Sequence, residues 1–240
     1  MKKIILETLN LFNLDLKRYP SIDKRRRMNL MKSSNIDLVF DVGANIGQFG
    51  QELRRLGYKG RIESFEPIKS VFDSLYNNSL KDSNWGVHHF GLGDVSGSSI
   101  INISRNFVSS SILSINDDHL KGERNSEVVD SEQITVNTLE DVYDDLVKSH
   151  RNIYLKIDTQ GFEMKVLKGG KSRLKQIRLI QLEISLTSLY DGESTMFEVL
   201  SFMNSLGFVL VSIENGFEDY GRHRLLQIDA LFLNENLKLD

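Results

Sequence analysis

An apolar run that leads directly into a glycine-bearing loop constrains the fold of this chain most strongly. Leu38, Val39 and Phe40 have the pattern of a buried strand, and the loop Asp-Val-Gly-Ala-Asn-Ile-Gly follows at 41–47. In parallel α/β sheets, a strand, a tight loop and a helix form the corner that binds ligands, because the start of the helix offers free N–H groups. We therefore expect an α/β fold with a ligand at this corner.

The chain repeats this succession of strand and helix. Apolar runs predict core strands at 36–41, 61–65, 85–90, 153–157 and 179–184, with helices at 47–56, 67–77, 138–148, 163–168 and 195–207. A hairpin is expected from 208–213 and 225–233, and short strands from 100–103 and 134–136, whereas the highly charged residues 116–130 are expected to be mobile. The pattern predicts a Rossmann-like sheet of five parallel strands with a C-terminal antiparallel hairpin and helices on both faces.

Residues 1–34 have a different character from the rest. Leucines between residues 6 and 16 allow an amphipathic helix that ends near Tyr19 and Pro20, and the basic run 24–27 leads into a second short helix. We expect 1–34 to form a helical cap with a solvated basic turn and 35–240 to form the main domain. The alternative for the basic run is a patch that contacts anionic substrates or a membrane surface.

Composition excludes several classes of function. The net charge of −3 gives no reason to expect nucleic acid as the main partner, and the absence of cysteine excludes thiol nucleophiles and disulfides. No apolar run is long enough for a membrane span, and no small-residue cleavage site follows the N-terminal segment. We expect a cytoplasmic protein; the sequence leaves its oligomeric state open.

Acidic residues stand at the predicted carboxyl ends of the core strands. In an open α/β sheet these ends meet at one edge, so the acids would gather there. Their mutual repulsion requires compensation, which ligand hydroxyls, an ammonium group or a metal could supply. The acids are Asp41, Glu66, Asp94, Asp158 and Glu183.

The loop at 41–47 favours one class of cofactor over another. Glu66 has the position of the acid that binds ribose hydroxyls in nucleotide-binding folds. Asn45 replaces the glycine that a dinucleotide fingerprint needs near the pyrophosphate, and Asp41 would repel phosphates but suits an amino group. The pattern favours S-adenosylmethionine. An NAD-dependent oxidoreductase of Rossmann type is the alternative, weakened by the absence of an evident Tyr-x-x-x-Lys pair.

Several segments together resemble the FkbM-type methyltransferases, which use S-adenosylmethionine. The most specific segment is Leu-Lys-Ile-Asp-Thr-Gln-Gly-Phe-Glu at 155–163, continued by 166–169 and supported by the strand that contains Asp229. Further matching segments are 40–47, 65–67, 91–94, 182–184, 189–193 and 227–232. Where the family commonly has Val-Glu-Gly after the aspartate, this chain has Thr159, Gln160 and Gly161, which removes one acid.

This resemblance implies an O-methyltransferase acting on hydroxyls of sugars, polyketides or related natural products. Residues 188–193 look like versions found with bacterial surface-polysaccharide genes, so a sugar or glycan hydroxyl in polysaccharide biosynthesis is the preferred acceptor. The resemblance implies that the amino-acid tail of the cofactor is bound by Asp41, Gly43, Asn45 and Gly47. It implies that Glu66 binds the ribose hydroxyls and that Leu92 and Asp94 flank the adenine.

Methyl transfer to a hydroxyl requires a group that accepts or displaces its proton. Asp158 is the leading candidate for the base and Glu183 the next, and the two could instead share a divalent cation through their oxygens. Glu163 either assists or is a helix-start acid favoured by the helix dipole. Ser111, Tyr190 and His223 are candidate contacts for the acceptor. A cofactor-binding module without catalysis, recruiting partners through its N-terminal helix, is the alternative of a different class.

Overall fold

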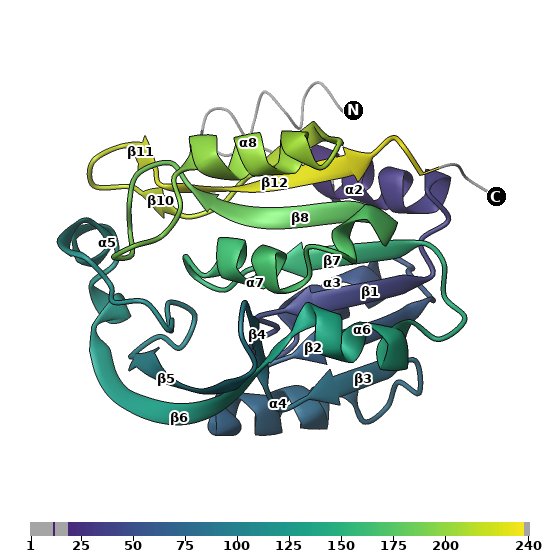
Figure 1. Cartoon of the computed structure of the whole chain (residues 1–240). Helices are drawn as coiled ribbons and strands as arrows, with labels where there is room; N and C mark the ends of the chain where they lie inside the picture. The colour runs from purple at the N-terminus through teal and green to yellow at the C-terminus, as the bar shows by residue number, and fades with distance from the viewer. Residues whose placement is uncertain (1–11, 13–18, 238–240) are drawn as a thin grey trace.

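The computed structural model describes residue 12 and residues 19–237 (Figure 1). The helix predicted over residues 6–16 falls on a segment of which only residue 12 is described. The main sheet has seven strands in the order β3-β2-β1-β7-β8-β12-β9. Their bounds in that order are Trp85–His88, Arg61–Phe65, Leu38–Val42, Ile153–Ile157, Ile177–Ser185, Gln227–Asn234 and Phe208–Asn215.

Strand directions confirm the predicted Rossmann-like sheet. β3, β2, β1, β7 and β8 pair in parallel, and β12 runs antiparallel to both β8 and β9. From β1 the chain continues to β2 and β3 on one side, whereas β7 and β8 lie on the other side. The crevice between β1 and β7 is therefore the topological switch point, where ligands bind in folds of this type.

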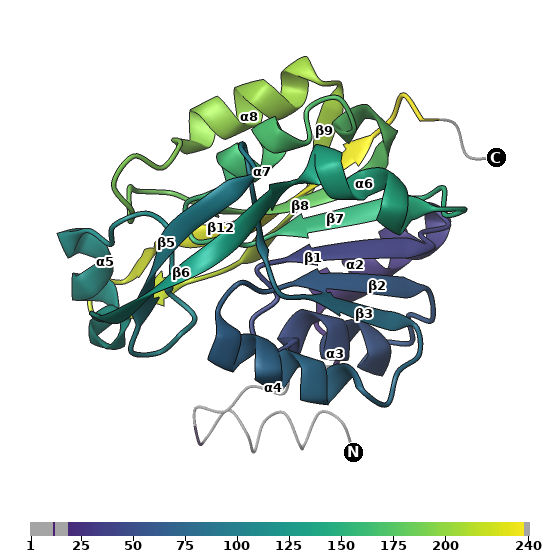
Figure 2. The same cartoon turned by 60° about the horizontal axis from the view of Figure 1, so that its bottom comes forward.

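Helices cover both faces of the sheet, as Figures 1 and 2 show. One face carries α2 (Ile22–Ser33), α3 (Gln48–Arg55) and α4 (Lys69–Ser79), whose buried residues include Met31, Leu53 and Leu75. The other face carries α6 (Leu139–Val147), α7 (Glu163–Gly169) and α8 (Met196–Ser205), whose buried residues include Tyr143, Leu167 and Met203. Two separate apolar cores hold the three layers together.

Two helices begin directly after a threonine that caps them, whereas a third begins later than the sequence predicts. Thr138 caps α6, and Thr195 with Glu198 forms a capping box at the start of α8. Pro67 was expected to be the first residue of a helix, but α4 begins at Lys69. The backbone N–H of Ile68 donates a 2.9 Å hydrogen bond to Glu66, which keeps this short segment extended before the helix can start.

A three-stranded sheet forms an arm beside the carboxyl ends of the main strands (Figure 2). It consists of β4 (Gly91–Gly93), β6 (Val128–Thr138) and β5 (Gly97–Ser104), and α5 (Asp117–Gly122) lies between β5 and β6 along the chain. Residues 116–130, expected to be mobile, contain α5 and the first part of β6, and the strand expected over 134–136 extends over Val128–Thr138. Most of β6 is exposed and polar, and only its buried residues Ile134 and Val136 give an apolar signal.

The basic run lies inside α2, not in a solvated turn. Arg27 is buried, donates a hydrogen bond to Glu52 and lies 3.5 Å from Glu214. Lys24 also pairs with Glu52. These ion pairs join α2 to α3 and β9, because a buried guanidinium needs carboxylate partners.

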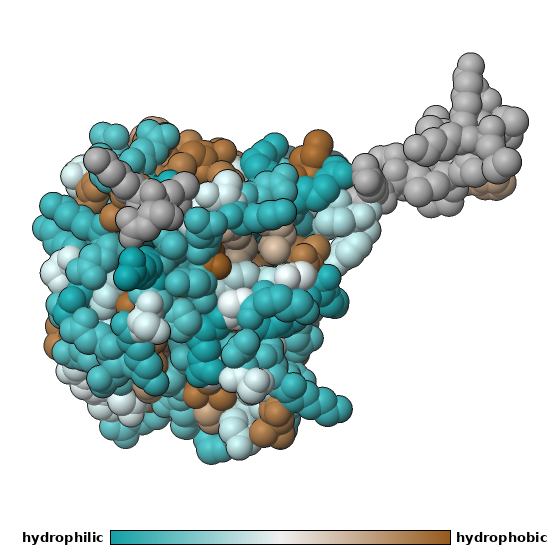
Figure 3. Space-filling view, turned by 90° about the vertical axis from the view of Figure 1, so that its right-hand side faces the viewer, coloured by the Kyte–Doolittle hydropathy of each residue, from teal (hydrophilic) through white to brown (hydrophobic). Residues whose placement is uncertain are grey.

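The face shown in Figure 3 is mainly hydrophilic, and its apolar side chains stand in separate patches. Over the part of the chain that the structure describes, no helix combines the length and hydropathy needed to cross a bilayer. The remaining elements are short: a 3-10 turn at Arg124–Ser126, another at Leu174–Gln176, and the two-stranded ladder of β10 (Glu218–Asp219) and β11 (Arg224–Leu225).

Candidate active site

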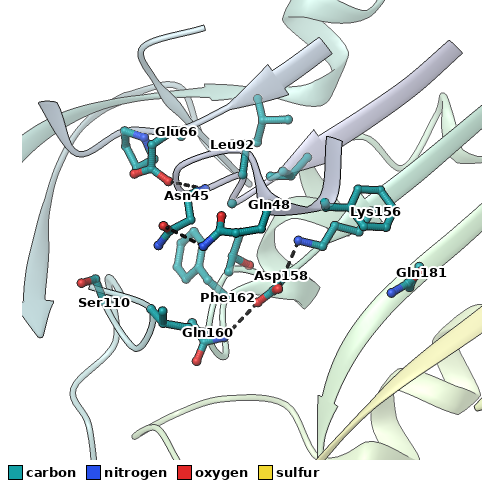
Figure 4. A pocket seen from close by; sticks show the side chains of 18 of the residues that line it. Asn45, Gln48, Glu66, Leu92, Ser110, Lys156, Asp158, Gln160, Phe162 and Gln181 are labelled. Carbon is teal, nitrogen blue, oxygen red and sulfur yellow. Dashed lines mark hydrogen bonds and ion pairs between the residues drawn. The ribbon is translucent and has the colours of Figure 1, made fainter. Parts of the chain in front are cut away.

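A cavity of about 440 Å³ opens at the carboxyl ends of β1 and β7, at the topological switch point (Figure 4). Its volume is in the range of small-molecule sites. One part has apolar walls that include Leu92, Ile101 and Ile134, and another part is lined by charged side chains. Asp158 lines the same cavity, directly after β7.

A side chain does not fit at Gly43, because the end of β7 approaches this position closely. Its φ of +73° lies in the left-handed region, and a Cβ at this position would stand 1.8 Å from the carbonyl oxygen of Asp158. Gly47 also has a positive φ, but it packs against Trp85 and does not line the cavity. Of the two predicted loop glycines, the structure places Gly43 at the cavity and Gly47 behind it.

Glu66 ties the loop after β1 to the end of β2. It accepts 2.9 Å hydrogen bonds from the backbone N–H groups of Asn45 and Ile68, and both Glu66 and Asn45 line the cavity. Burial raises the pKa of Glu66 to about 7, although the two N–H groups oppose this shift. Near pH 7 the Glu66 side chain is therefore present in both its neutral and its ionised form. Its oxygens can accept hydrogen bonds from hydroxyl groups of a ligand.

Asp41 lies beneath the floor of the cavity and does not line it. Its carboxyl is fully buried, accepts a 3.2 Å hydrogen bond from Ser64 and lies 3.5 Å from the ammonium of Lys156. Burial raises the pKa of Asp41, against the effect of Lys156. In the register of the sheet Asp41 is the direct partner of Lys156, so the two side chains share one face.

The two residues expected beside adenine are separated. Leu92, in β4, lines the apolar part of the cavity. Asp94 lies outside the cavity lining and forms a 2.9 Å ion pair with Lys165 of α7. Phe162, which precedes α7, lines the cavity in its place.

Asp158 is held as a carboxylate. The ammonium of Lys156 lies 3.1 Å from one of its oxygens, and the Gln160 amide donates a 2.9 Å hydrogen bond to the other (Figure 4). Burial alone would raise the pKa of Asp158, but Lys156 and Gln160 outweigh burial and hold that pKa below its ordinary value. Its side chain is 31% exposed, so a reactant in the cavity can reach it.

Glu183 has the opposite protonation preference. It accepts hydrogen bonds of 2.5 Å from Gln160 and 2.9 Å from Gln227. Burial, followed by the charges of Asp158 and Asp229, raises the pKa of Glu183 well above its ordinary value. A carboxylate and a neutral carboxyl group therefore stand side by side, which is the arrangement by which enzymes separate the roles of two acids.

Glu163 holds the loop that follows β7. It accepts hydrogen bonds from the backbone N–H groups of Thr159, at 2.8 Å, and Gly161, at 3.2 Å. Burial raises its pKa to about 7, and the Thr159 N–H opposes the shift. Glu163 does not line the cavity, so its contacts are those of an acid that shapes the start of α7.

Two of the three predicted acceptor contacts instead hold Gln160. The Ser111 hydroxyl donates a 2.7 Å hydrogen bond to the backbone carbonyl of Gln160, and the Tyr190 hydroxyl donates a 2.6 Å hydrogen bond to its side-chain oxygen. His223 is exposed in the turn between β10 and β11 and does not line the cavity. The loop that follows β5 of the arm supplies Phe107, Val108 and Ser110 to the lining.

Gln160 is the residue whose importance the sequence understated. It has a φ of 56°, which is uncommon for a residue other than glycine, and its side chain contacts both candidate acids. The departure from the family's Val-Glu-Gly pattern was the available signal. The apolar contacts of Phe107 and Val108 had no signal, because the arm's course is set by pairing between distant strands.

The repulsion expected among the acids is compensated by the chain's own groups. Lys156, Gln160 and two backbone N–H groups contact Asp41, Asp158, Glu183 and Glu66. No cluster of three or more metal-ligating side chains is formed within residues 19–237. The Gln160 amide nitrogen points at oxygens of both Asp158 and Glu183.

Comparison with known proteins identifies the family. The sequence profile described as Methyltransferase FkbM domain matches residues 41–210, which include the loop after β1, Glu66, Asp158 and Glu183. No curated protein matches the chain.

Solved structures of similar fold include an rRNA methylase from Streptococcus thermophilus, at 9% identity and a TM-score of 0.48, covering 90% of this chain and 99% of that one. A putative tRNA methyltransferase from Streptococcus pneumoniae, in complex with S-adenosyl-L-methionine, has 13% identity and a TM-score of 0.48, covering 91% and 76%. With most of the main sheet inside the matched region, the chain belongs to the FkbM methyltransferase family.

Proposed function

We propose that this protein transfers the methyl group of S-adenosylmethionine to a hydroxyl of a sugar, a glycan or a related natural product. The observation that carries the proposal is Asp158, a carboxylate kept ionised by Lys156 at the edge of the cavity. Transfer to an alcohol needs such a group, because the hydroxyl has to lose its proton as the new bond forms.

The cavity residues fit the methyl donor. Glu66 offers carboxylate oxygens to the ribose hydroxyls, and the loop that contains Gly43 and Asn45 lies beside it for the amino-acid tail. Leu92 and Phe162 supply apolar contacts for the adenine. When bound, the sulfonium of the cofactor supplies a methyl group that needs no further activation.

Asp158 is the proposed proton acceptor. The hydroxyl oxygen forms its bond to the methyl carbon, the carbon–sulfur bond breaks with its electron pair left on sulfur, and Asp158 receives the hydroxyl proton. Lys156 keeps Asp158 ionised before the reaction. Positioning of the hydroxyl in line with the methyl group supplies much of the remaining acceleration.

The charge of the cavity favours an uncharged, hydroxylated acceptor over nucleic acid. Its polar part is lined by Glu52 and Glu214, which pair with Lys24 and Arg27 of the same lining, and by Asp229, so the cavity presents no excess of positive charge to a phosphate backbone. The exposed apolar residues Phe107 and Val108 line the same cavity and suit the apolar face of a sugar ring. The resemblance of residues 188–193 to versions found with surface-polysaccharide genes supports a role in polysaccharide biosynthesis.

A screen with labelled methyl donor tests the proposal. Purified protein is incubated with nucleotide sugars, lipid-linked glycans and, as a competing class, structured RNA, and transfer of label is measured. We expect label in a sugar-containing acceptor and none in RNA. Asp158→Asn is the control, because it keeps the shape of the side chain but removes the base. Label in RNA, or undiminished transfer by the Asp158→Asn variant, would contradict the proposal.

A further inference from the structure

The side-chain amide of Gln160 stands between the two acids of the site. Its nitrogen lies 2.9 Å from an oxygen of Asp158 and 2.5 Å from an oxygen of Glu183. An amide nitrogen carries two hydrogens, so it can donate one to each carboxyl group. The amide therefore joins the two acids into one hydrogen-bonded unit.

The orientation of this amide follows from its contacts at both ends. Tyr190 is fully buried, and its hydroxyl lies 2.6 Å from the side-chain oxygen of Gln160 and 3.3 Å from the backbone carbonyl oxygen of Ser109, so the shorter contact is to Gln160. A turned amide would also place its oxygen against the Asp158 carboxylate, which only accepts hydrogen bonds. Ser111 anchors the backbone of Gln160 through its carbonyl oxygen. The nitrogen consequently faces Asp158 and Glu183.

A donor in this position opposes a divalent cation. Such a cation needs oxygen ligands turned toward it, and here N–H groups point at the facing oxygens of both acids. The Lys156 ammonium, 3.1 Å from the second oxygen of Asp158, adds a positive charge that would repel the cation. A carboxylate in place of the amide would reverse this, because it would add an oxygen ligand and a negative charge.

We infer that Gln160 is a positioning residue that makes the carboxyl pair of this enzyme independent of a divalent cation, holding Asp158 as the proton acceptor and Glu183 as its neutral partner. The inference rests on the proposed function for the role of Asp158 as base. The arrangement of charge and its response to metal are measurable without methyl transfer, so the two can fail separately.

The decisive experiment measures Mn²⁺ binding by electron paramagnetic resonance in the full chain. The wild type is compared with Gln160→Glu and with Gln227→Glu. Gln227 is a matched control, because it is also a buried amide that donates to Glu183 but has no hydrogen bond to Asp158. We expect Gln160→Glu to bind Mn²⁺ about tenfold more tightly than the wild type and Gln227→Glu to remain like the wild type.

Two results would overturn the inference. The first is Mn²⁺ binding by the wild type that is lost in Asp158→Asn, since the natural pair would then hold a cation. The second is equal Mn²⁺ affinity in the folded Gln160→Glu and Gln227→Glu variants, since any added charge would then suffice. If Gln160→Glu does not fold, the wild type and Asp158→Asn still decide, because wild-type binding that is absent or unaffected by Asp158→Asn supports the inference.

An infrared measurement tests the positioning role itself. The carbonyl stretch of a protonated carboxyl group, isolated as the difference between wild type and Glu183→Gln, reports the neutral state of Glu183. We expect this band at neutral pH in the wild type. In Gln160→Ala, which removes both hydrogen bonds, we expect its titration to move by about one pH unit. A band that is absent from the wild type, or a titration unchanged in Gln160→Ala, would contradict the role.

Discussion

The ammonium of Lys156 lies 3.1 Å from Asp158 and 3.5 Å from Asp41. One buried cation thus connects the floor of the cavity, at β1, with the candidate base that follows β7. Asp158 and Asp41 oppose the effect of burial and raise the pKa of Lys156 above its ordinary value, so it stays charged. The site is organised around this cation, and removing it leaves two carboxyl groups without their cationic partner.

Lys156→Met should therefore destabilise the protein strongly. Breaking a buried ion pair costs about 3–5 kcal/mol, because the remaining charge loses its partner. Denaturant unfolding measures the loss. Lys165→Met is the matched control, since the pair of Lys165 with Asp94 is partly exposed to solvent and should contribute less than about 1 kcal/mol. Similar losses of unfolding free energy in both variants would show that the buried ion pair contributes no more to stability than the pair of Lys165 with Asp94.

Asp158→Asn should reduce turnover by about 10²- to 10⁴-fold, the usual contribution of a general base. S-adenosylmethionine affinity should change by less than about threefold, since the proposed cofactor contacts lie at Glu66 and the loop after β1. Calorimetry and the labelled-methyl assay measure the two quantities. Asp94→Asn, which alters an acid outside the cavity lining, should leave both near wild-type values. A fully active Asp158→Asn variant would remove this residue from the mechanism.

Glu66→Gln should weaken S-adenosylmethionine binding by about tenfold, because each charge-assisted hydrogen bond to a hydroxyl contributes about 1.5–3 kcal/mol. The wild-type affinity should rise with pH through the Glu66 pKa of about 7 and level off above it, since the ionised form is the better acceptor. Calorimetry across this range checks both statements. Glu163→Gln is the control, because Glu163 has a similar pKa of about 7 but does not line the cavity.

The same two carboxyl groups should make the ligand-free protein less stable as pH rises. Their pKa values are raised from 4.5 to about 7 in the folded state, so folding takes up protons in this interval. The stabilisation is complete below pH 4.5 and is lost as pH rises through about 7. Glu66→Gln and Glu163→Gln should each flatten the curve of unfolding free energy against pH by about 1–3 kcal/mol. An unchanged slope in both variants would contradict the assignment.

Gly43→Ala should destabilise the protein and weaken cofactor binding. The new Cβ would collide with the carbonyl of Asp158 at 1.8 Å, so β1 and the end of β7 would have to separate. Gly57→Ala is a matched control, because Gly57 also has a positive φ of +96° but nothing lies within 4 Å of its Cβ position. The control should cost about 1–2 kcal/mol of backbone strain. Equal losses in denaturant unfolding would show that the contact with β7 is unimportant.

The amino-acid sequence alone determined the sheet, the loop and the leading acids. Apolar runs such as 153–157 are long enough to predict buried parallel strands, and in an open parallel sheet the residues after these strands meet at one edge. Glu66, Asp158 and Glu183 stand at the ends of such strands and lie in one region of the molecule. The starts of α6 and α8 also depend on local sequence, because Thr138 and Thr195 accept hydrogen bonds from backbone N–H groups within one helical turn.

Only the tertiary structure decided what each polar residue does. Asp94 follows a strand as Asp158 does, but it pairs with Lys165 outside the cavity lining. Ser111 and Tyr190 are far apart in sequence, and both bind Gln160, which in turn contacts two acids. The physical reason is that the protonation state of a carboxyl group depends on burial and on donors within about 3–4 Å, and these donors come from segments distant in the chain.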